Sequence, residues 1–270
     1  MLRKEIADYY QEAAEEARLA TGPAQLEFAR TKEIVRRYLP PPPATILDVG
    51  GAAGAYSLWL AERGYQVHLV DPVPRLVAEA RCRSAASSNR NCSCQVGDAR
   101  ALAFAENAAD GVLLLGPLYH LTEEAERSRA LREAYRVLRG GGILFAAAIS
   151  RYASALDGLA RDLLADADFR RIVTTDLEQG QHRNPTHNRD YFTTAYFHRP
   201  EELRAEVMSA GFTCCAVFGL EGPGWLLPDF EERWADSRKR EDLLRVARAL
   251  EREASIVGVS AHLLAVGTKE

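Results

Sequence analysis

Short apolar segments alternate with longer segments of helical pattern between residues 44 and 150. Regular alternation of this kind is typical of an α/β domain with a parallel sheet. The run 111–116 is almost wholly apolar, as a central strand buried on both faces should be. Strands are predicted at 46–49, 66–70, 93–96, 111–116 and 143–149, and helices at 55–63, 72–84 and 122–139.

The alternation ends after Ser150, and two insertions follow. Residues 151–192 are too long for an ordinary loop. They contain a predicted helix at 155–164 and a polar, ring-rich run at 180–192. The remaining predicted segments are a helix at 200–210, strands at 213–219 and 260–267, and a helical insertion at 220–254 between those two strands.

Helical patterns also precede the first strand. Residues 1–39 are rich in Ala, Glu and Arg, and the prolines at 40–43 end the second of two predicted helices. These helices either pack on the edge of the sheet or cover a site as a lid. We therefore divide the chain into a helical N-terminal lid at 1–43, a core at 44–150, a cap at 151–198, and a part at 199–270 that completes the sheet and holds the insertion 220–254.

A glycine-rich turn joins the first predicted strand to the first predicted helix of the core. Gly50, Gly51 and Gly54 follow Asp48 within this turn. Glycine adopts positive φ and lets a ligand approach the backbone, and a helix N-terminus offers open N–H groups. Asp71 ends the next strand about 20 residues further on, where a carboxylate can accept hydrogen bonds from ribose hydroxyls. The order of turn, helix, strand and acidic residue predicts a nucleoside-containing ligand.

The stretch 46–54 resembles motif I of the class I S-adenosylmethionine-dependent methyltransferases, with Asp48, Gly50 and Gly54 at matching positions. Ala52 stands where that motif usually has its middle glycine. The resemblance covers the core well and roughly the last 70 residues loosely. It implies a Rossmann-like, doubly wound α/β sheet of seven strands, parallel except for an antiparallel last strand beside the sixth, with a helical N-terminal lid and cap insertions.

The same resemblance implies S-adenosyl-L-methionine as the cofactor and methyl transfer by in-line displacement. Positioning supplies most of the rate in such a reaction, and a general base is needed only where the nucleophile holds its proton. The sequence does not specify which atom of the acceptor is methylated. We expect an oxygen or nitrogen nucleophile of a small molecule. The expected cofactor contacts are Tyr10, Arg30, Asp48, Gly50, Gly51, Ala52, Gly54, Asp71, Pro72, Asp98, Ala99, Leu115 and Gly116.

Several of these contacts have expected roles that the resemblance supplies, with alternatives that stay open. Asp71 matches the residue that binds the ribose. Asp98 matches one that accepts from the adenine amino group, although a loop aspartate can instead form an Asx turn. Arg30 can pair with the methionine carboxylate, form a structural ion pair or lie on a solvated helix face. Tyr9 or Tyr10 is expected to cover the cofactor.

Tyr119 and His120 follow the fourth predicted strand, where the resembling family places residues beside the transferred methyl group. They are the candidate catalytic residues, because either can orient a nucleophile or accept its proton. The alternative for His120 is that it caps the next helix or bonds a backbone carbonyl. The polar run of the cap supplies candidate substrate contacts, with a solvated loop as the alternative. These candidates are His182, Arg183, His187, Arg189 and Tyr191.

Composition narrows the class of protein. The 270 residues carry a net charge of −4, which gives no reason to expect nucleic acid as a partner. No apolar run reaches the roughly 20 residues that span a bilayer, and the N-terminus lacks the apolar core of a secretion signal. The five cysteines form no C-x-x-C pair, so we assign no metal site and expect reduced thiols in a cytoplasmic protein. The expected partner is a small-molecule methyl acceptor, with neither nucleic acid nor membrane.

Two other functions compete with methyl transfer. The first is a nicotinamide-dependent oxidoreductase on a related sheet. The lack of a G-x-G-x-x-G motif and the pair Gly97-Asp98 after the third strand weigh against it. The second is a non-catalytic protein that binds a cofactor or a partner with the same fold, which only a test of binding or activity separates from an enzyme.

Overall fold

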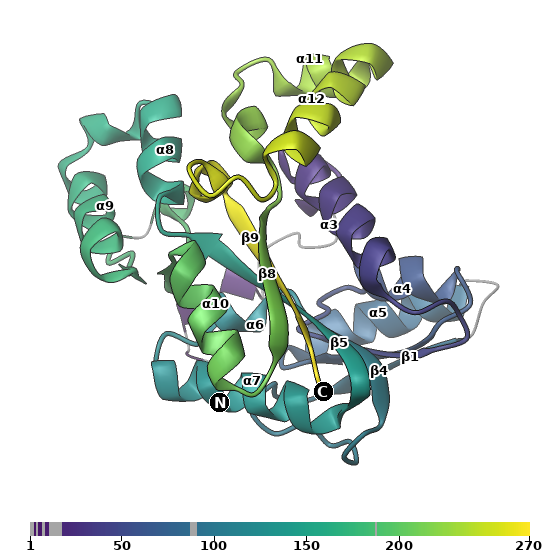
Figure 1. The fold of residues 1–270 in the computed structure, drawn as a ribbon. Coiled ribbons are helices and arrows are strands. Elements are labelled where there is room, and N and C mark those ends of the chain that lie inside the picture. Colours follow the sequence, from purple (N-terminus) through teal and green to yellow (C-terminus); the bar gives the residue numbers. More distant parts are fainter. Residues whose placement is uncertain (1–2, 4, 7–8, 11–17, 87–90, 187) are drawn as a thin grey trace.

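The fold is described from a computed structural model (Figure 1), which places residues 3, 5–6, 9–10, 18–86, 91–186 and 188–270. Seven strands of this part of the chain form the main sheet. They are β1 (Thr45–Val49), β2 (Gln66–Asp71), β3 (Cys92–Val96), β4 (Ala109–Leu114), β5 (Leu138–Ser150), β8 (Thr213–Gly219) and β9 (His262–Thr268).

The order of the strands reverses direction in the middle of the sheet. The parallel part runs β3-β2-β1-β4-β5, and β9 lies antiparallel between β5 and β8. This arrangement confirms the predicted doubly wound sheet with an antiparallel last strand. In open α/β sheets, ligands bind in the crevice at the carboxyl ends of the strands where the order reverses. Here that crevice lies beyond β1 and β4.

Helices cover both faces of the sheet (Figure 1), because successive strand residues point to opposite sides. Ile46 and Phe145 pack toward one face, whereas their neighbours Leu47 and Leu144 pack toward the other. All four side chains are fully buried, so each face contributes its own part of the core. The first face carries α3 (Ala24–Tyr38), α4 (Ala55–Ala61) and α5 (Pro74–Ala86), and the second carries α6 (Pro117–His120), α7 (Glu124–Val137) and α10 (Pro200–Ser209).

The first insertion forms a helical cap with two short strands that extend the sheet. Asp166 begins the longest cap helix, because its carboxylate accepts the N–H groups of Asp168 and Phe169 at 2.6 and 3.2 Å. The strand pair continues the sheet where Phe197 lies beside Ile149. Sequence analysis predicted neither this helix nor the strand pair. The cap elements are α8 (Ala153–Ala160), η1 (Leu163–Ala165), α9 (Ala167–Gln179), β6 (Gln181–His182), η2 (Arg189–Tyr191) and β7 (Ala195–His198).

The second insertion packs against the N-terminal helix α3. Leu26 of α3 contacts Phe230 and Leu243 in a separate small core, and Figure 1 shows α11 and α12 beyond one end of α3. None of the described helices is long and apolar enough to cross a membrane. The elements of this insertion are η3 (Gly222–Leu226), α11 (Phe230–Ala235), α12 (Ser237–Leu250) and η4 (Val257–Val259).

The glycine turn after β1 packs directly on the start of α6. Gly50 has a φ of +77°, and a Cβ added there would lie 2.6 Å from Cδ of Pro117. A left-handed conformation costs a residue other than glycine about 1–2 kcal/mol, and overpacking costs about 1–3 kcal/mol. We therefore expect Gly50→Ala to destabilise the protein by about 2–5 kcal/mol, measured as a lower midpoint of urea unfolding.

Gly141→Ala separates the two causes of this loss. Gly141 has nearly the same φ, +79°, but no described atom lies within 4 Å of the position that a Cβ would take there. Its substitution should therefore cost only the backbone part, about 1–2 kcal/mol. Equal losses in the two variants would show that the contact with Pro117 does not matter.

Candidate cofactor and acceptor site

Loops after β1, β2, β3 and β4 line one cavity at the carboxyl ends of these strands. Residues from the N-terminal segment close its other side. Of the expected cofactor contacts, Gly54 and Arg30 are absent from the lining. The expected residues that line the cavity are Tyr10, Asp48, Gly50, Gly51, Ala52, Asp71, Pro72, Asp98, Ala99, Leu115 and Gly116, together with the candidate catalytic residues Tyr119 and His120.

Asp71 holds the glycine turn in place from the end of the neighbouring strand. Its Oδ2 accepts the Ala52 N–H at 3.0 Å, and its Oδ1 accepts the Val73 N–H at 2.9 Å. Burial raises the pKa of this carboxyl above its usual range, although both N–H groups act in the opposite direction. Ala52 takes a φ of +46°, a left-handed conformation that a glycine would adopt without strain.

Asp48 lies beneath the same turn and is almost fully buried. Ser57 of α4 donates its hydroxyl to Asp48 Oδ2 at 2.6 Å, so the aspartate joins the strand to the helix that follows. Burial raises the pKa of Asp48 to about 6. A Cβ at Gly51 would lie 2.9 Å from this same oxygen and 2.8 Å from Leu69, so the turn has no space for a larger residue.

Asp98 lines the cavity but also forms the predicted alternative, an Asx turn. Its Oδ1 accepts the Arg100 N–H at 2.9 Å, and its Oδ2 accepts from the Arg100 guanidinium at 2.6 Å. These hydrogen bonds keep the pKa of Asp98 below its usual range. Arg100 also pairs with Glu126, so the carboxylate is held in one orientation at the cavity wall.

Arg30 lies away from the cavity, contrary to the expected contact with the cofactor. Its side chain is fully buried and pairs with Glu33 and with Glu251, which follows α12. Arg30 therefore forms a structural ion pair, which was one of the alternatives predicted from the sequence. Arg18 lines the cavity instead and forms a two-point ion pair with Glu27, at 2.9 and 3.2 Å.

His120 and Tyr10 form a hydrogen-bonded pair at the cavity wall. The Tyr10 hydroxyl lies 2.7 Å from His120 Nε2, and His120 Nδ1 makes a longer contact of 3.5 Å with the carbonyl oxygen of Thr194. Because a carbonyl oxygen only accepts, this arrangement assigns the ring proton to Nδ1 and leaves Nε2 to accept from Tyr10. Burial lowers the pKa of His120 to about 4, so the imidazole is neutral near pH 7.

A second cavity of about 340 Å³ adjoins the first on the side of the cap. Tyr10, Arg18 and Tyr119 line both cavities. Among the expected substrate contacts, His182 and Tyr191 line the second cavity. Arg183 lines neither cavity, and His187 and the side chain of Arg189 lie outside what the structure describes.

His182 is fixed inside the cap by both of its ring nitrogens. Nδ1 lies 2.8 Å from the Asp176 carboxylate, and Nε2 lies 2.7 Å from the carbonyl oxygen of Tyr191. Both partners only accept, so both hydrogen bonds form when each nitrogen carries a proton. The ring also stacks on Phe197. Both ring nitrogens are therefore used in hydrogen bonds that stabilise the cap. The side chain contributes to the cavity wall mainly through the carbon atoms of its ring.

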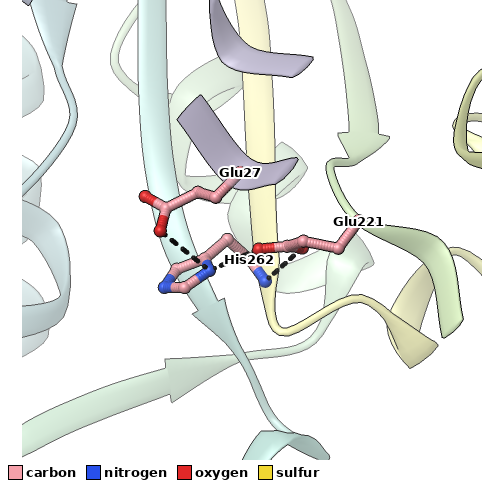
Figure 2. Close-up of side chains that lie close together, drawn as sticks. All are labelled: Glu27, Glu221 and His262. Atoms are coloured by element: carbon pink, nitrogen blue, oxygen red, sulfur yellow. Dashed lines mark hydrogen bonds and ion pairs between the residues drawn. The ribbon is translucent and has the colours of Figure 1, made fainter. Parts of the chain in front are cut away.

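Three ionisable residues meet beside the second cavity from distant parts of the chain (Figure 2). His262 Nδ1 lies 2.6 Å from Glu221 Oε1 and 3.7 Å from Glu27 Oε2. Among the described residues, their ligand atoms are close enough together to hold a metal ion, all within 4.8 Å. The Arg18 guanidinium on Glu27 and the His262 N–H groups on Glu221 already occupy these oxygens, so we interpret the group as an ion-pair cluster. Sequence analysis missed it because Glu221 and His262 are 41 positions apart and Glu27 is more distant still.

The cluster makes the stability of the protein depend on pH. Burial alone would lower the pKa of His262, but the carboxylates of Glu27 and Glu221 outweigh it, and the pKa is raised. The stabilisation is therefore complete below the unfolded-state pKa of about 6.5 and is lost as pH rises through the folded-state value. We expect the midpoint of urea unfolding to fall as pH rises from about 6.5 through the folded-state pKa of His262.

His262→Gln tests this expectation, because glutamine keeps an N–H donor but does not titrate. The fall in the urea midpoint should shrink in this variant. His68→Gln is the matched control, since His68 bonds Ser93 on β3 and lies outside both cavities. An unchanged pH dependence in His262→Gln would contradict the assignment.

Comparisons with known proteins identify the domain that holds the glycine turn. A family model described as a methyltransferase domain matches residues 47–146, which hold the glycine turn, Asp71, Asp98 and His120. Residues 47–146 are a methyltransferase domain, and the relatives and the fold support a class I S-adenosylmethionine-dependent methyltransferase. The same findings support S-adenosyl-L-methionine as the cofactor.

Individual members of the family are similar to the chain over different lengths. The ubiquinone/menaquinone biosynthesis C-methyltransferase UbiE of Zymomonas mobilis is 31% identical over 113 residues, 42% of this chain and 46% of that protein. A ubiquinone biosynthesis O-methyltransferase of Xanthomonas axonopodis is 29% identical over 208 residues, 76% of this chain and 75% of that protein. The matches to UbiE proteins of three bacteria, that of Zymomonas mobilis among them, span about half of their length.

A solved structure supports the fold. A SAM-dependent methyltransferase of Methanosarcina mazei is 19% identical, with a TM-score of 0.58 over 87% of this chain and 96% of the other. At this identity the likeness shows the fold alone.

The residues of the first cavity fit the cofactor of the family. Carboxylates stand at the ends of β2 and β3, where they can accept from hydroxyl and amino groups. Between them, the turn at Gly50, Gly51 and Ala52 presents backbone with no side chain larger than a methyl group. Asp71 and Asp98 were predicted for this cavity because each follows a predicted strand, whereas Arg18 was not predicted because no such local signal adjoins it.

Proposed function

We propose that this chain transfers a methyl group from S-adenosyl-L-methionine to an oxygen or nitrogen atom of a small molecule. The observation that carries the proposal is the wall formed by Tyr10, Arg18 and Tyr119, which lines both cavities. A molecule in the second cavity therefore borders the cofactor cavity. The volume of the second cavity, about 340 Å³, is at the lower end of the range for small-molecule sites, roughly 300–1,000 Å³.

The protein's residues would hold the cofactor at three places. Asp71 and the glycine turn would bind the ribose, and Asp98 would bind the adenine amino group. We assign the carboxylate of the cofactor to Arg18, because Arg30 is buried elsewhere and Arg18 lines the cavity. When bound, S-adenosyl-L-methionine supplies an electrophilic methyl group on a sulfonium centre.

We propose that His120 receives the proton that the acceptor loses. The Tyr10 hydroxyl donates to His120 Nε2, so it blocks direct access to this nitrogen but leaves its own oxygen lone pairs as acceptors. The proton can therefore pass from the acceptor to Tyr10 while Tyr10 gives its own proton to His120. Tyr119 borders both cavities and would orient the acceptor.

Calorimetric titration tests the proposal first. The full chain should bind S-adenosyl-L-methionine and should not bind NADH, which serves as the parallel control. Binding of NADH alone would replace methyl transfer by hydride transfer, and binding of neither would overturn the assignment of the first cavity.

Transfer of a radiolabelled methyl group then tests the reaction. The enzyme is incubated with labelled cofactor and a mixture of cell metabolites, proteins and nucleic acids. Label should appear in the small-molecule fraction. Label only in protein or nucleic acid would contradict the proposed substrate class, and label in no fraction would support the non-catalytic alternative.

A further inference from the structure

Two polar residues of α8 line the second cavity without lining the first. Ser154 has only 8% of its surface exposed, and its Oγ has no hydrogen-bond partner among the described residues. Asp157 follows three residues later on the same face of the helix. Buried polar side chains nearly always have a hydrogen-bond partner, so the unpartnered Ser154 hydroxyl favours a ligand group beside α8.

The charges around this cavity leave an excess of negative charge. Each basic side chain in its lining already has a carboxylate partner, since Arg18 pairs with Glu27, His182 with Asp176, and His262 with Glu221. The two lining carboxylates, Asp157 and Asp190, share a single partner among the described residues. That partner, Arg161, lies 3.1 and 3.8 Å from them and stands outside the lining.

The surroundings of Asp157 favour a further cation. Its side chain is about one-third exposed, and burial raises its pKa despite the opposing charge of Arg161. Arg161 is itself about half exposed, so its ion pair with Asp157 is a surface pair of the kind that contributes little. A buried cation in the cavity would be a stronger partner for the carboxylate than Arg161 is.

Aromatic rings dominate the rest of the lining. Eight of its seventeen residues are Phe, Tyr or Trp. The negative face of an aromatic ring attracts a cation, and this attraction is strongest where water is excluded. An anionic ligand would be repelled by each ring that turns its face to the cavity.

From these observations we propose that the methyl acceptor is a small amine whose ammonium group is anchored by Asp157 and Ser154 at the α8 end of the second cavity. This inference rests on the proposed function, because it names the substrate class of that site. Asp157 and Ser154 line only the second cavity, whereas Tyr10 and Tyr119 line both. The anchored ammonium is therefore a binding group, and the atom that accepts the methyl group lies elsewhere in the acceptor.

Three probes that differ mainly in charge test the proposal by calorimetric titration of the full chain. They are 2-phenylethylamine, 2-phenylethanol and 3-phenylpropanoate, which are cationic, neutral and anionic at pH 7 and share one ring. The amine should bind at least tenfold more tightly than the other two. Asp157→Asn should weaken amine binding at least tenfold, and Ser154→Ala should weaken it to a smaller extent. Asp168→Asn is the matched control, because Asp168 lies on α9, pairs with Arg171 and lines neither cavity.

The outcomes separate this proposal from the proposed function. An amine that binds no better than the alcohol and the carboxylate, or that binds equally well to Asp157→Asn, would overturn the anchoring site even if methyl transfer is found. Amine binding that depends on Asp157, with no methyl transfer to any acceptor, would support the anchoring site and reject the function. Binding of S-adenosyl-L-methionine to Asp157→Asn should match the wild type, which verifies that the variant is folded.

Discussion

Asp71→Ala should weaken binding of S-adenosyl-L-methionine about 10- to 100-fold. The substitution removes the proposed acceptor for the ribose and also releases the Ala52 and Val73 N–H groups, which Asp71 holds at 3.0 and 2.9 Å. A hydrogen bond to a charged group contributes about 1.5–3 kcal/mol, and each 1.4 kcal/mol changes an affinity tenfold. Calorimetric titration of the purified variant measures the effect directly.

The control for this prediction is an aspartate at the amino ends of the strands, on the opposite side of the sheet from the first cavity. Asp110 also accepts a backbone N–H, that of Thr45 at 2.8 Å, but it stands at the amino end of β4 and outside the first cavity. Asp110→Ala should therefore leave cofactor affinity within a few-fold of the wild type. Asp98→Ala should weaken binding as well. Unchanged affinity in both Asp71→Ala and Asp98→Ala would reject the assignment of the cofactor site.

The first half of the fold was predictable because its signals are local. The apolar runs at 46–49 and 66–70, the glycine turn and the terminal Asp71 each specify structure within a few residues, and the structure has β1, β2 and the turn at those places. The boundary between the helix predicted at 122–139 and the strand predicted at 143–149 was less accurate. β5 begins at Leu138, which pairs with Ala109, so residues 140–142 lie within the strand.

The side chains that come from the insertions were not predictable in the same way. Arg30 was a candidate cofactor contact because a guanidinium can pair with a carboxylate. The direction of its side chain depends instead on the packing of α12 against α3, because Glu251, just beyond the end of α12, pairs with it. The cluster of Glu27, Glu221 and His262 likewise requires α3, η3 and β9 to meet (Figure 2). Such contacts depend on tertiary structure, and no local pattern in the sequence reports them.

The second large effect is expected at the hydrogen-bonded pair of Tyr10 and His120. Removing a general base typically lowers kcat by about 10²- to 10⁴-fold, and we expect a loss in this range for His120→Ala. The dissociation constant for S-adenosyl-L-methionine should change much less, because the proposed cofactor anchors Asp71 and Asp98 remain. Steady-state kinetics with an identified acceptor, together with calorimetric titration of the cofactor, separate the two quantities. His68→Gln is the control, since it changes a histidine on β2 that lines neither cavity.

Tyr10→Phe and a pH profile decide how the proton reaches His120. If the Tyr10 hydroxyl passes the proton to Nε2, which lies 2.7 Å away, Tyr10→Phe should lose nearly as much activity as His120→Ala. The base is active while neutral, and burial lowers the pKa of His120 to about 4. Activity should therefore fall as pH decreases through about 4, not through the ordinary histidine value of about 6.5. A wild-type rate that halves near the ordinary histidine pKa, with a similar profile in His120→Ala, would show that another group accepts the proton and that His120 only positions Tyr10.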